Sequence, residues 1–179
     1  MKTIIFSFSL LFSIVNLAQQ PYKQTLKLMG SHFEITVVAK DSIQANNDIK
    51  LAILEITRIE KLISSWDENS QTSEINRNAG IKPVKVDAEL FQLIERAIKV
   101  SKLTNGAFDI SYASMDKVWI FDGTMTKMPS DEVIKKSVEK VDYKNIILNK
   151  ENSTVFLKLK GMKIGFGAIG KGYAADKAK

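Results

Sequence analysis

The sequence predicts an α+β fold in which antiparallel strands pack against helices, and three patterns lead to this expectation. Residues 25–40 (TLKLMGSHFEITVVAK) alternate apolar and polar side chains, which is typical of half-buried strands. Residues 43–66 and 87–106 instead repeat apolar side chains at helical spacing. Three short apolar runs between residues 145 and 167 then follow one another without a helical segment between them, which favours antiparallel pairing.

The first twenty residues (MKTIIFSFSLLFSIVNLAQQ) have the organisation of a secretory signal. Lys2 precedes an apolar run over residues 4–15, and Ala18 is a small residue near a plausible cleavage point. We therefore expect a signal peptide at residues 1–18, a mature domain at residues 19–179, and an exported or periplasmic protein. The alternative is an uncleaved N-terminal anchor, although the run is short for a membrane span.

Composition narrows the classes of function. The chain has no cysteine, which excludes disulfides, thiolate metal sites, a cysteine nucleophile and a lipidated N-terminal cysteine. Its 179 residues indicate one domain with a substantial core. The net charge of +6 comes mostly from lysines that alternate with acidic residues, as at residues 130–144, so it describes a solvated surface. We expect no nucleic-acid partner.

The N-terminal half begins with the predicted strands. Residues 25–40 are expected to form two strands, or one strand bent at Gly30. The helix at residues 43–66 should begin after an N-cap at Asp41 or Ser42. The polar stretch at residues 64–80 breaks the apolar pattern, so it is expected to be a loop with at most a short turn.

The C-terminal half should begin with the helix at residues 87–106, capped by Asp87 and ended by Asn105 and Gly106. A third helix is expected at residues 129–141, with Ser130 as its cap. Three antiparallel strands should follow, at residues 145–149, 153–160 and 162–167.

A last helix is expected from about Ile169. It carries Ala174, Ala175 and Ala178, and no element follows against which these alanines could be buried. We therefore expect the chain to be the N-terminal part of a larger domain, truncated at its C-terminus.

Residues 165–176 (GFGAIGKGYAAD) match two phosphate-binding patterns, and a particular feature argues against each. G-x-G-x-x-G should open a βαβ unit, but the preceding runs predict antiparallel strands. A P-loop needs serine or threonine after its lysine, where this chain has Gly172. Glycines before a helix, with Lys171 beside them, still suit a phosphate. A turn needed only for tight strand–helix packing is the alternative, and the sequence leaves both open.

Three other segments could serve a flat ligand. In residues 104–112 (TNGAFDISY), Phe108 can stack and Asp109 can accept hydrogen bonds from an adenine or a hydroxyl; a helix end followed by a strand is the alternative. Trp66 lies in a polar loop, where it either covers a flat group or fills a gap. Met29 is either a core residue or the lining of a ring pocket.

Four segments, in this order, resemble the FAD:protein FMN transferase (ApbE) family. They are MGSHFEI, SSWDENSQTSEINRN, TNGAFDISYASMDKVW and GFGAIGKGYAAD, and together they span nearly all of the mature chain. The resemblance implies an ApbE-like (T-fold-like) domain. It also implies an enzyme that cleaves FAD and attaches FMN through a phosphoester to a threonine or serine of an acceptor flavoprotein. Mg²⁺ would assist, and the acceptor could bring the enzyme close to a membrane.

The resemblance also assigns roles to single residues. Gly170 matches a position whose backbone carbonyl binds the metal, and Lys171 would lie near the pyrophosphate. The positions that resemble FAD-contacting ones are Met29, Trp66, Ala107, Phe108, Asp109, Gly167, Lys171 and Asp176.

The chain departs from the family pattern in three places. Gly165 stands where many relatives have an acid, and Trp66 replaces a frequent tyrosine. The family's metal-binding acid and threonine, and its base, lie in a C-terminal part that nothing in this chain matches. The catalytic residues are therefore unknown, and the chain alone is expected to be inactive. Two rival functions are a metal-dependent FAD pyrophosphatase that releases FMN and AMP, and a non-catalytic periplasmic FAD-binding protein.

Overall fold

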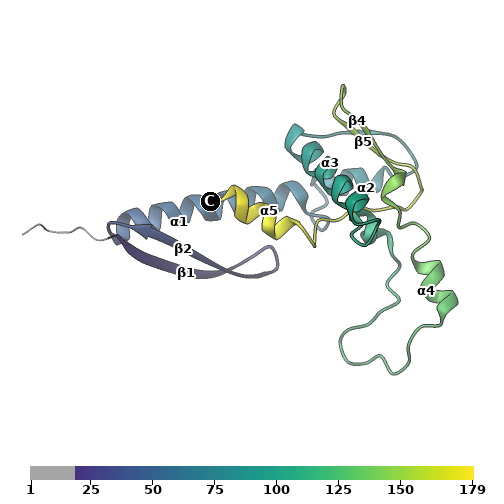
Figure 1. Cartoon of the computed structure of the whole chain (residues 1–179), viewed down its shortest axis with the longest axis horizontal. Helices are drawn as coiled ribbons and strands as arrows, with labels where there is room; N and C mark the ends of the chain where they lie inside the picture. Colours follow the sequence, from purple (N-terminus) through teal and green to yellow (C-terminus); the bar gives the residue numbers. More distant parts are fainter. Residues whose placement is uncertain (1–18) are drawn as a thin grey trace, which may run out of the picture.

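The computed structural model describes residues 19–179, and the predicted signal peptide at residues 1–18 lies outside the described residues. An elongated part contains β1, β2, α1 and α5, and a rounder part contains the remaining elements (Figure 1). The strands pair antiparallel in two separate sheets. The expected α+β architecture is thus confirmed.

The N-terminal hairpin confirms the prediction of two strands. β1 (Gln20–Leu28) pairs antiparallel with β2 (Ser31–Ala39). The two turn residues both lie in the left-handed region, with φ of 49° at Met29 and 71° at Gly30. Such a two-residue turn matches the right-handed twist of the strands that it joins.

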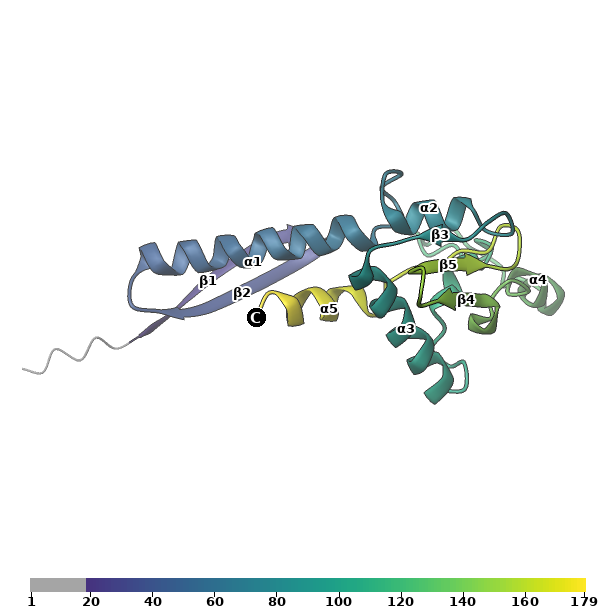
Figure 2. The same ribbon diagram turned by 90° about the horizontal axis from the view of Figure 1, so that it is seen from above.

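The long helix α1 (Ser42–Ile63) lies along the hairpin (Figures 1 and 2). The carboxylate of Asp41 caps it by accepting a hydrogen bond of 2.8 Å from the backbone N–H of Gln44. Because α1 is about 33 Å long, it reaches from the far end of the hairpin to the main core. Ile56, Ile59 and Ile63 belong to that core.

The helix α2 (Gln71–Arg77) corrects the expectation of a loop at residues 64–80. Ser70 caps it by accepting from the backbone N–H of Ser73 at 3.0 Å, and Ile75 anchors it in the core. With one large apolar residue in two turns, the segment had no apolar periodicity to reveal it.

The helix α3 (Ala88–Leu103) lies where it was expected. Asp87 occupies the N-cap position but makes no capping bond, so its predicted capping role is wrong. Its carboxylate accepts from the Nε2 of Gln71 at 2.7 Å instead, and its own N–H donates to the Oε1 of Gln71 at 2.8 Å. This paired contact joins the starts of α2 and α3. The predicted end at Asn105 and Gly106 is confirmed, since both have positive φ.

The second sheet has the strand order β3-β5-β4. β4 (Ile146–Asn149) and β5 (Thr154–Leu157) form the expected antiparallel pair, and β3 (Val84–Lys85) adds to the other edge of β5. The strand predicted at residues 162–167 does not form.

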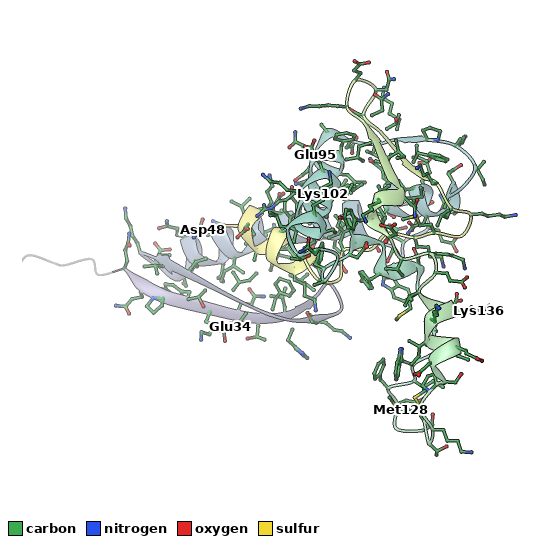
Figure 3. The ribbon with its side chains drawn as sticks, turned by 45° about the vertical axis from the view of Figure 1, so that its right-hand side comes forward. Glu34, Asp48, Glu95, Lys102, Met128 and Lys136 are labelled. Atoms are coloured by element: carbon green, nitrogen blue, oxygen red, sulfur yellow. The ribbon has the colours of Figure 1, made fainter. Side chains whose placement is uncertain are left out.

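The segment between α3 and β4 is mostly irregular. It starts with the short 3-10 helix η1 (Ile110–Ser114) and a loop, and continues into α4 (Asp131–Ser137), which Ser130 caps as predicted. Figure 3 shows the loop and α4 projecting from the body, with Met128 and Lys136 labelled. A second 3-10 helix, η2 (Tyr143–Asn145), leads into β4.

The last helix, α5 (Gly170–Lys177), packs beside α1. Ala174 is fully buried there, against elements that precede it in the chain, whereas Ala175 is exposed. None of the described helices is both long and apolar enough to cross a membrane.

Candidate functional site

Side chains, rather than a neighbouring strand, hold the segment that leads into the glycines. The side-chain amide of Asn76 donates to the carbonyl of Ile164 at 3.1 Å and accepts from its N–H at 2.8 Å. The hydroxyl of Ser114 donates to the carbonyl of Lys163 at 2.8 Å and accepts from its N–H at 2.7 Å. These bonds replace the ladder that a strand would have made. Sequence reasoning overlooked both side chains, and no local pattern marks them.

The segment at residues 165–170, called the glycine loop below, begins beside η1. The N–H of Gly165 donates to the carbonyl of Ile110 at 3.1 Å, so the glycine loop is joined directly to the residue that follows Asp109. A Cβ on Gly167 would lie 2.5 Å from the hydroxyl oxygen of Tyr112. A Cβ on Gly170 would lie 2.6 Å from the Cδ1 of Ile63 and 3.6 Å from the Cε of Met29. Tight packing therefore accounts for both glycines, while Gly167 itself remains exposed.

The Gly-Ala-Phe-Asp segment turns the chain from α3 into η1. The carboxylate of Asp109 accepts from the N–H of Ser111 at 2.7 Å, from its hydroxyl at 2.7 Å and from the N–H of Tyr143 at 2.9 Å. Asp109 therefore caps η1 and ties it to η2. Phe108 packs against the core, whereas Ala107 is exposed. A contact of these residues with FAD stays a prediction.

Two predicted ring-lining residues have different environments. Met29 is half-buried against the core beside Gly170, as its position in the hairpin turn requires. Trp66 is 86% exposed, so it fills no gap in the described fold. The Nζ of Lys117 lies 6.0 Å from the centre of its ring. The ring of Trp66 is thus free to cover a flat group, as one of the two interpretations of the sequence requires.

The two predicted charged residues of α5 do not share a face. Lys171 and Asp176 are separated by five positions, which places them well apart around a helix. Asp176 lines a hollow of about 290 Å³ between α3 and α5, which Arg96 and the loop residues Ala168 and Ile169 also line. Lys171 is exposed and does not line this hollow.

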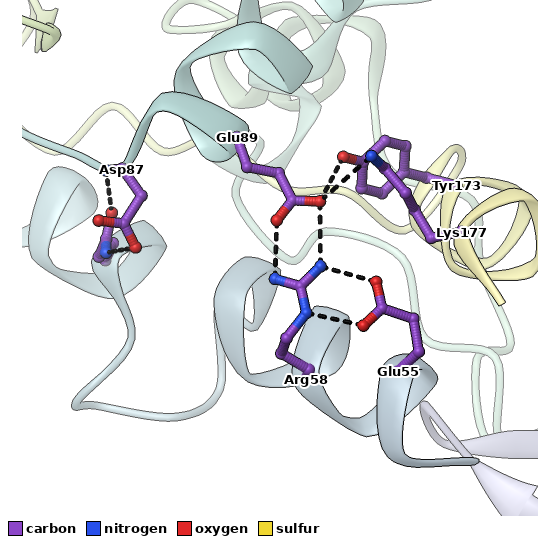
Figure 4. Close-up of polar contacts among 7 residues, drawn as sticks. Glu55, Arg58, Asp87, Glu89, Tyr173 and Lys177 are labelled. Atoms are coloured by element: carbon purple, nitrogen blue, oxygen red, sulfur yellow. Dashed lines mark hydrogen bonds and ion pairs between the residues drawn. The ribbon is translucent and has the colours of Figure 1, made fainter. Parts of the chain in front are cut away.

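A cluster of ion pairs fixes α5 to α1 and α3 (Figure 4). The guanidinium of Arg58 makes bonds of 2.7 and 3.1 Å to the carboxylate of Glu89 and of 2.7 and 2.8 Å to that of Glu55. From α5, the hydroxyl of Tyr173 donates to Glu89 at 2.7 Å, and the Nζ of Lys177 lies 3.7 Å from it. Glu89 thus receives partners from both neighbouring helices.

This cluster shifts the pKa of its members. Hydrogen bonds from Arg58 are the largest cause that lowers the pKa of Glu89, to about 2, against a smaller opposing effect of burial. Burial, followed by the bond to Glu89, raises the pKa of Tyr173 to about 12. The hydrogen bonds to Glu55 and Glu89 raise the pKa of Arg58 above the ordinary value of an arginine.

A loss of stability below pH 4.5 is the expected consequence. The pKa of Glu89 is about 2 in the folded chain against 4.5 for a free side chain, so the cluster's contribution is complete above pH 4.5 and is lost as the pH falls towards 2. Glu89→Gln should flatten the fall of the urea midpoint over this window. Glu95→Gln, at an exposed position of the same helix, is the control. Parallel losses in wild type and Glu89→Gln would contradict the assignment.

The metal ligand that the family resemblance assigns is a backbone carbonyl. Within residues 19–179, no three acidic or histidine side chains come together to hold a metal ion. The carbonyl of Gly170, in the first turn of α5, would supply one ligand, whereas Mg²⁺ prefers six oxygens in octahedral geometry. Metal binding by Gly170 stays a prediction.

Comparisons with known proteins give a family match and named relatives. The family model of the ApbE family matches residues 29–179. The FAD:protein FMN transferase of Klebsiella pneumoniae (strain 342) is 30% identical over 158 residues, which are 88% of this chain and 49% of that protein. The chain spans about half the length of the curated relatives that it matches first.

Solved structures of the family share the fold. The ApbE protein of Thermotoga maritima superposes with a TM-score of 0.77 at 31% identity, over 89% of this chain and 51% of that one. The apo flavinyl transferase ApbE of Pseudomonas stutzeri gives 0.74 at 19% identity, over 90% and 51% of the two chains, which bears on the fold alone. With the family model matching most of its length, the chain belongs to the ApbE family, as the four segments predicted.

Proposed function

We propose that the complete protein is a FAD:protein FMN transferase. The observation that carries the proposal is the family match over residues 29–179, which includes all four segments of the resemblance. The K. pneumoniae relative bears this name. In the proposed reaction, a threonine or serine hydroxyl of an acceptor flavoprotein attacks the phosphorus of the FMN half. The bond to the AMP half breaks, the hydroxyl loses its proton, and AMP leaves.

FAD would lie along the glycine loop, with its phosphates at Gly167 and Lys171. Two features support this placement: Gly167 is exposed, and Lys171 is a solvent-facing cation in the first turn of α5, where the end of a helix favours an anion. Trp66 would cover one ring, and Ala107, Phe108 and Asp109 would contact the nucleotide. Asp176, in the hollow beside α3, would act on the same ligand only if FAD extends over Ala168 and Ile169.

Mg²⁺ would neutralise charge on the pyrophosphate, as in other phosphoryl transfers. Gly170 would offer one oxygen to it. The base that takes the proton of the acceptor hydroxyl is not assigned to any described residue.

We also propose that the protein is exported to the periplasm. The support is the signal-like sequence at residues 1–18 and the absence of cysteine. An acceptor flavoprotein at the membrane would then place the enzyme close to the membrane surface.

The test incubates the full-length gene product with FAD, Mg²⁺ and a candidate acceptor domain, and follows the acceptor by mass spectrometry. We expect FMN joined covalently to one threonine or serine, with AMP released and the reaction abolished by EDTA. Free FMN and AMP without labelled protein would instead indicate the pyrophosphatase. Intact FAD that stays bound would indicate a binding protein.

A further inference from the structure

Tyr112 lies across the glycine loop. Its hydroxyl oxygen would be 2.5 Å from a Cβ on Gly167 and 3.3 Å from one on Gly165, so two glycines leave room for one phenol. Gly165 is the position where the family pattern often has an acid. In this chain, the polar atom nearest to the space of that missing side chain is the hydroxyl of Tyr112.

The backbone around Tyr112 is held on both sides. Ile110, two residues before it, accepts from the N–H of Gly165 at 3.1 Å. Ser114, two residues after it, exchanges two hydrogen bonds with Lys163. The phenol is therefore carried by a segment that is fixed to the glycine loop, and its position over the loop follows from these contacts.

The hydroxyl of Tyr112 has an unused hydrogen-bonding capacity. Among residues 19–179, no residue makes a hydrogen bond with it, and Tyr112 is 44% exposed. By contrast, the hydroxyl of Tyr173 donates to Glu89. A phenol hydroxyl can donate one hydrogen bond. Donation to an ionised oxygen makes a stronger bond than donation to a neutral one.

We propose that the hydroxyl of Tyr112 donates a hydrogen bond to a phosphate oxygen of the flavin nucleotide held at the glycine loop. Tyr112 thereby makes the site prefer flavins that carry phosphate, FAD and FMN, over riboflavin. The inference rests on the proposed function, because it requires a flavin phosphate at this loop.

The test measures flavin affinity of the full-length gene product by fluorescence quenching. In Tyr112→Phe, which keeps the ring, we expect the affinity for FAD and FMN to fall about tenfold or more, as for loss of a bond to a charged group. The affinity for riboflavin should not change. In the transfer reaction, KM for FAD should rise more than kcat falls. Tyr22→Phe removes a phenol hydroxyl on β1 and should change nothing.

A second variant tests the geometry. Gly167→Ala puts a methyl group against the Tyr112 oxygen, so it should weaken FAD binding in the wild-type background. In the Tyr112→Phe background its additional effect should be smaller, because the hydroxyl is already gone. Unfolding midpoints near the wild-type value would show that both variants remain folded.

The outcomes separate this inference from the proposed function. FAD affinity that is unchanged in Tyr112→Phe, or that falls equally for FAD and riboflavin, would overturn the role of the hydroxyl and leave the proposed function standing. Failure of the wild-type protein to bind any flavin would remove the proposed function, and the inference with it.

Discussion

Replacing Asn76 by alanine is expected to destabilise the fold by about 3 kcal/mol. The variant leaves two backbone groups of the fully buried Ile164, its N–H and its carbonyl, without a hydrogen-bond partner. The amide of Asn76 holds the N–H and the carbonyl of Ile164 at 2.8 and 3.1 Å, and Ile164 is 0% exposed. Each buried group left without a partner costs about 1–3 kcal/mol. Asn76→Asp should recover part of the loss, since a carboxylate still accepts from the N–H but cannot donate to the carbonyl.

Urea unfolding followed by circular dichroism measures this difference. The matched control is Asn78→Ala, in which the lost amide bonds a carbonyl of its own helix, that of Glu74, at an exposed site. It should lose less than about 1 kcal/mol. Equal losses for Asn76→Ala and Asn78→Ala would show that the paired bonds to Ile164 contribute little.

Gly170→Val should be the second large effect, destabilising by about 2–3 kcal/mol through overpacking. Its Cβ would lie 2.6 Å from the Cδ1 of Ile63 and 3.4 Å from the Cβ of Phe166, within the core that joins α5 to α1. The end of Ile63 can turn aside, but Ile63 is only 5% exposed, so its movement disturbs further neighbours. Because Gly170 begins α5, the displacement should also weaken flavin binding.

Gly172→Val is the matched control on the same helix. A Cβ at Gly172 meets nothing within 4 Å, so the helix keeps its packing and gains a residue with better helix propensity than glycine. Thermal unfolding of both variants separates packing from propensity. A Gly170→Val midpoint at or above that of Gly172→Val would show that α5 adapts without cost.

The elements that depend on neighbouring residues could be predicted from the sequence. Alternation along residues 25–40 and the glycine at the turn indicated the hairpin, and the capping residues Asp41 and Ser130 marked two helix starts. The segment at residues 162–167 shows the limit. Met162, Ile164 and Phe166 alternate along it and are buried, as in a strand, but periodicity says nothing of hydrogen-bond partners. Those partners, Asn76 and Ser114, lie 88 and 49 positions away.

The candidate site was predicted as segments rather than as contacts. The glycine loop and the Gly-Ala-Phe-Asp segment do meet, through the bond from Gly165 to Ile110. The ion-pair cluster around Glu89 could not be predicted from the sequence, because charged residues on three separate helices carry no local signal that they will pair. The alternative for residues 104–112, a helix end followed by a strand, is right about the helix end but wrong about the strand, because the 3-10 helix η1 follows and Asp109 caps it.

The length of α1 has a consequence for the cooperativity of the fold. Its last buried residues, Ile56, Ile59 and Ile63, belong to the main core, whereas Ala45, Ile49 and Ala52 are buried outside that cluster, where the helix packs on the hairpin. The N-terminal half of α1 is therefore stabilised mainly by packing on the hairpin, and its C-terminal half by packing in the main core. Local opening of the end of the hairpin far from its turn, together with the first turns of α1, can precede global unfolding, whereas the turn at Met29 stays packed against the core beside Gly170.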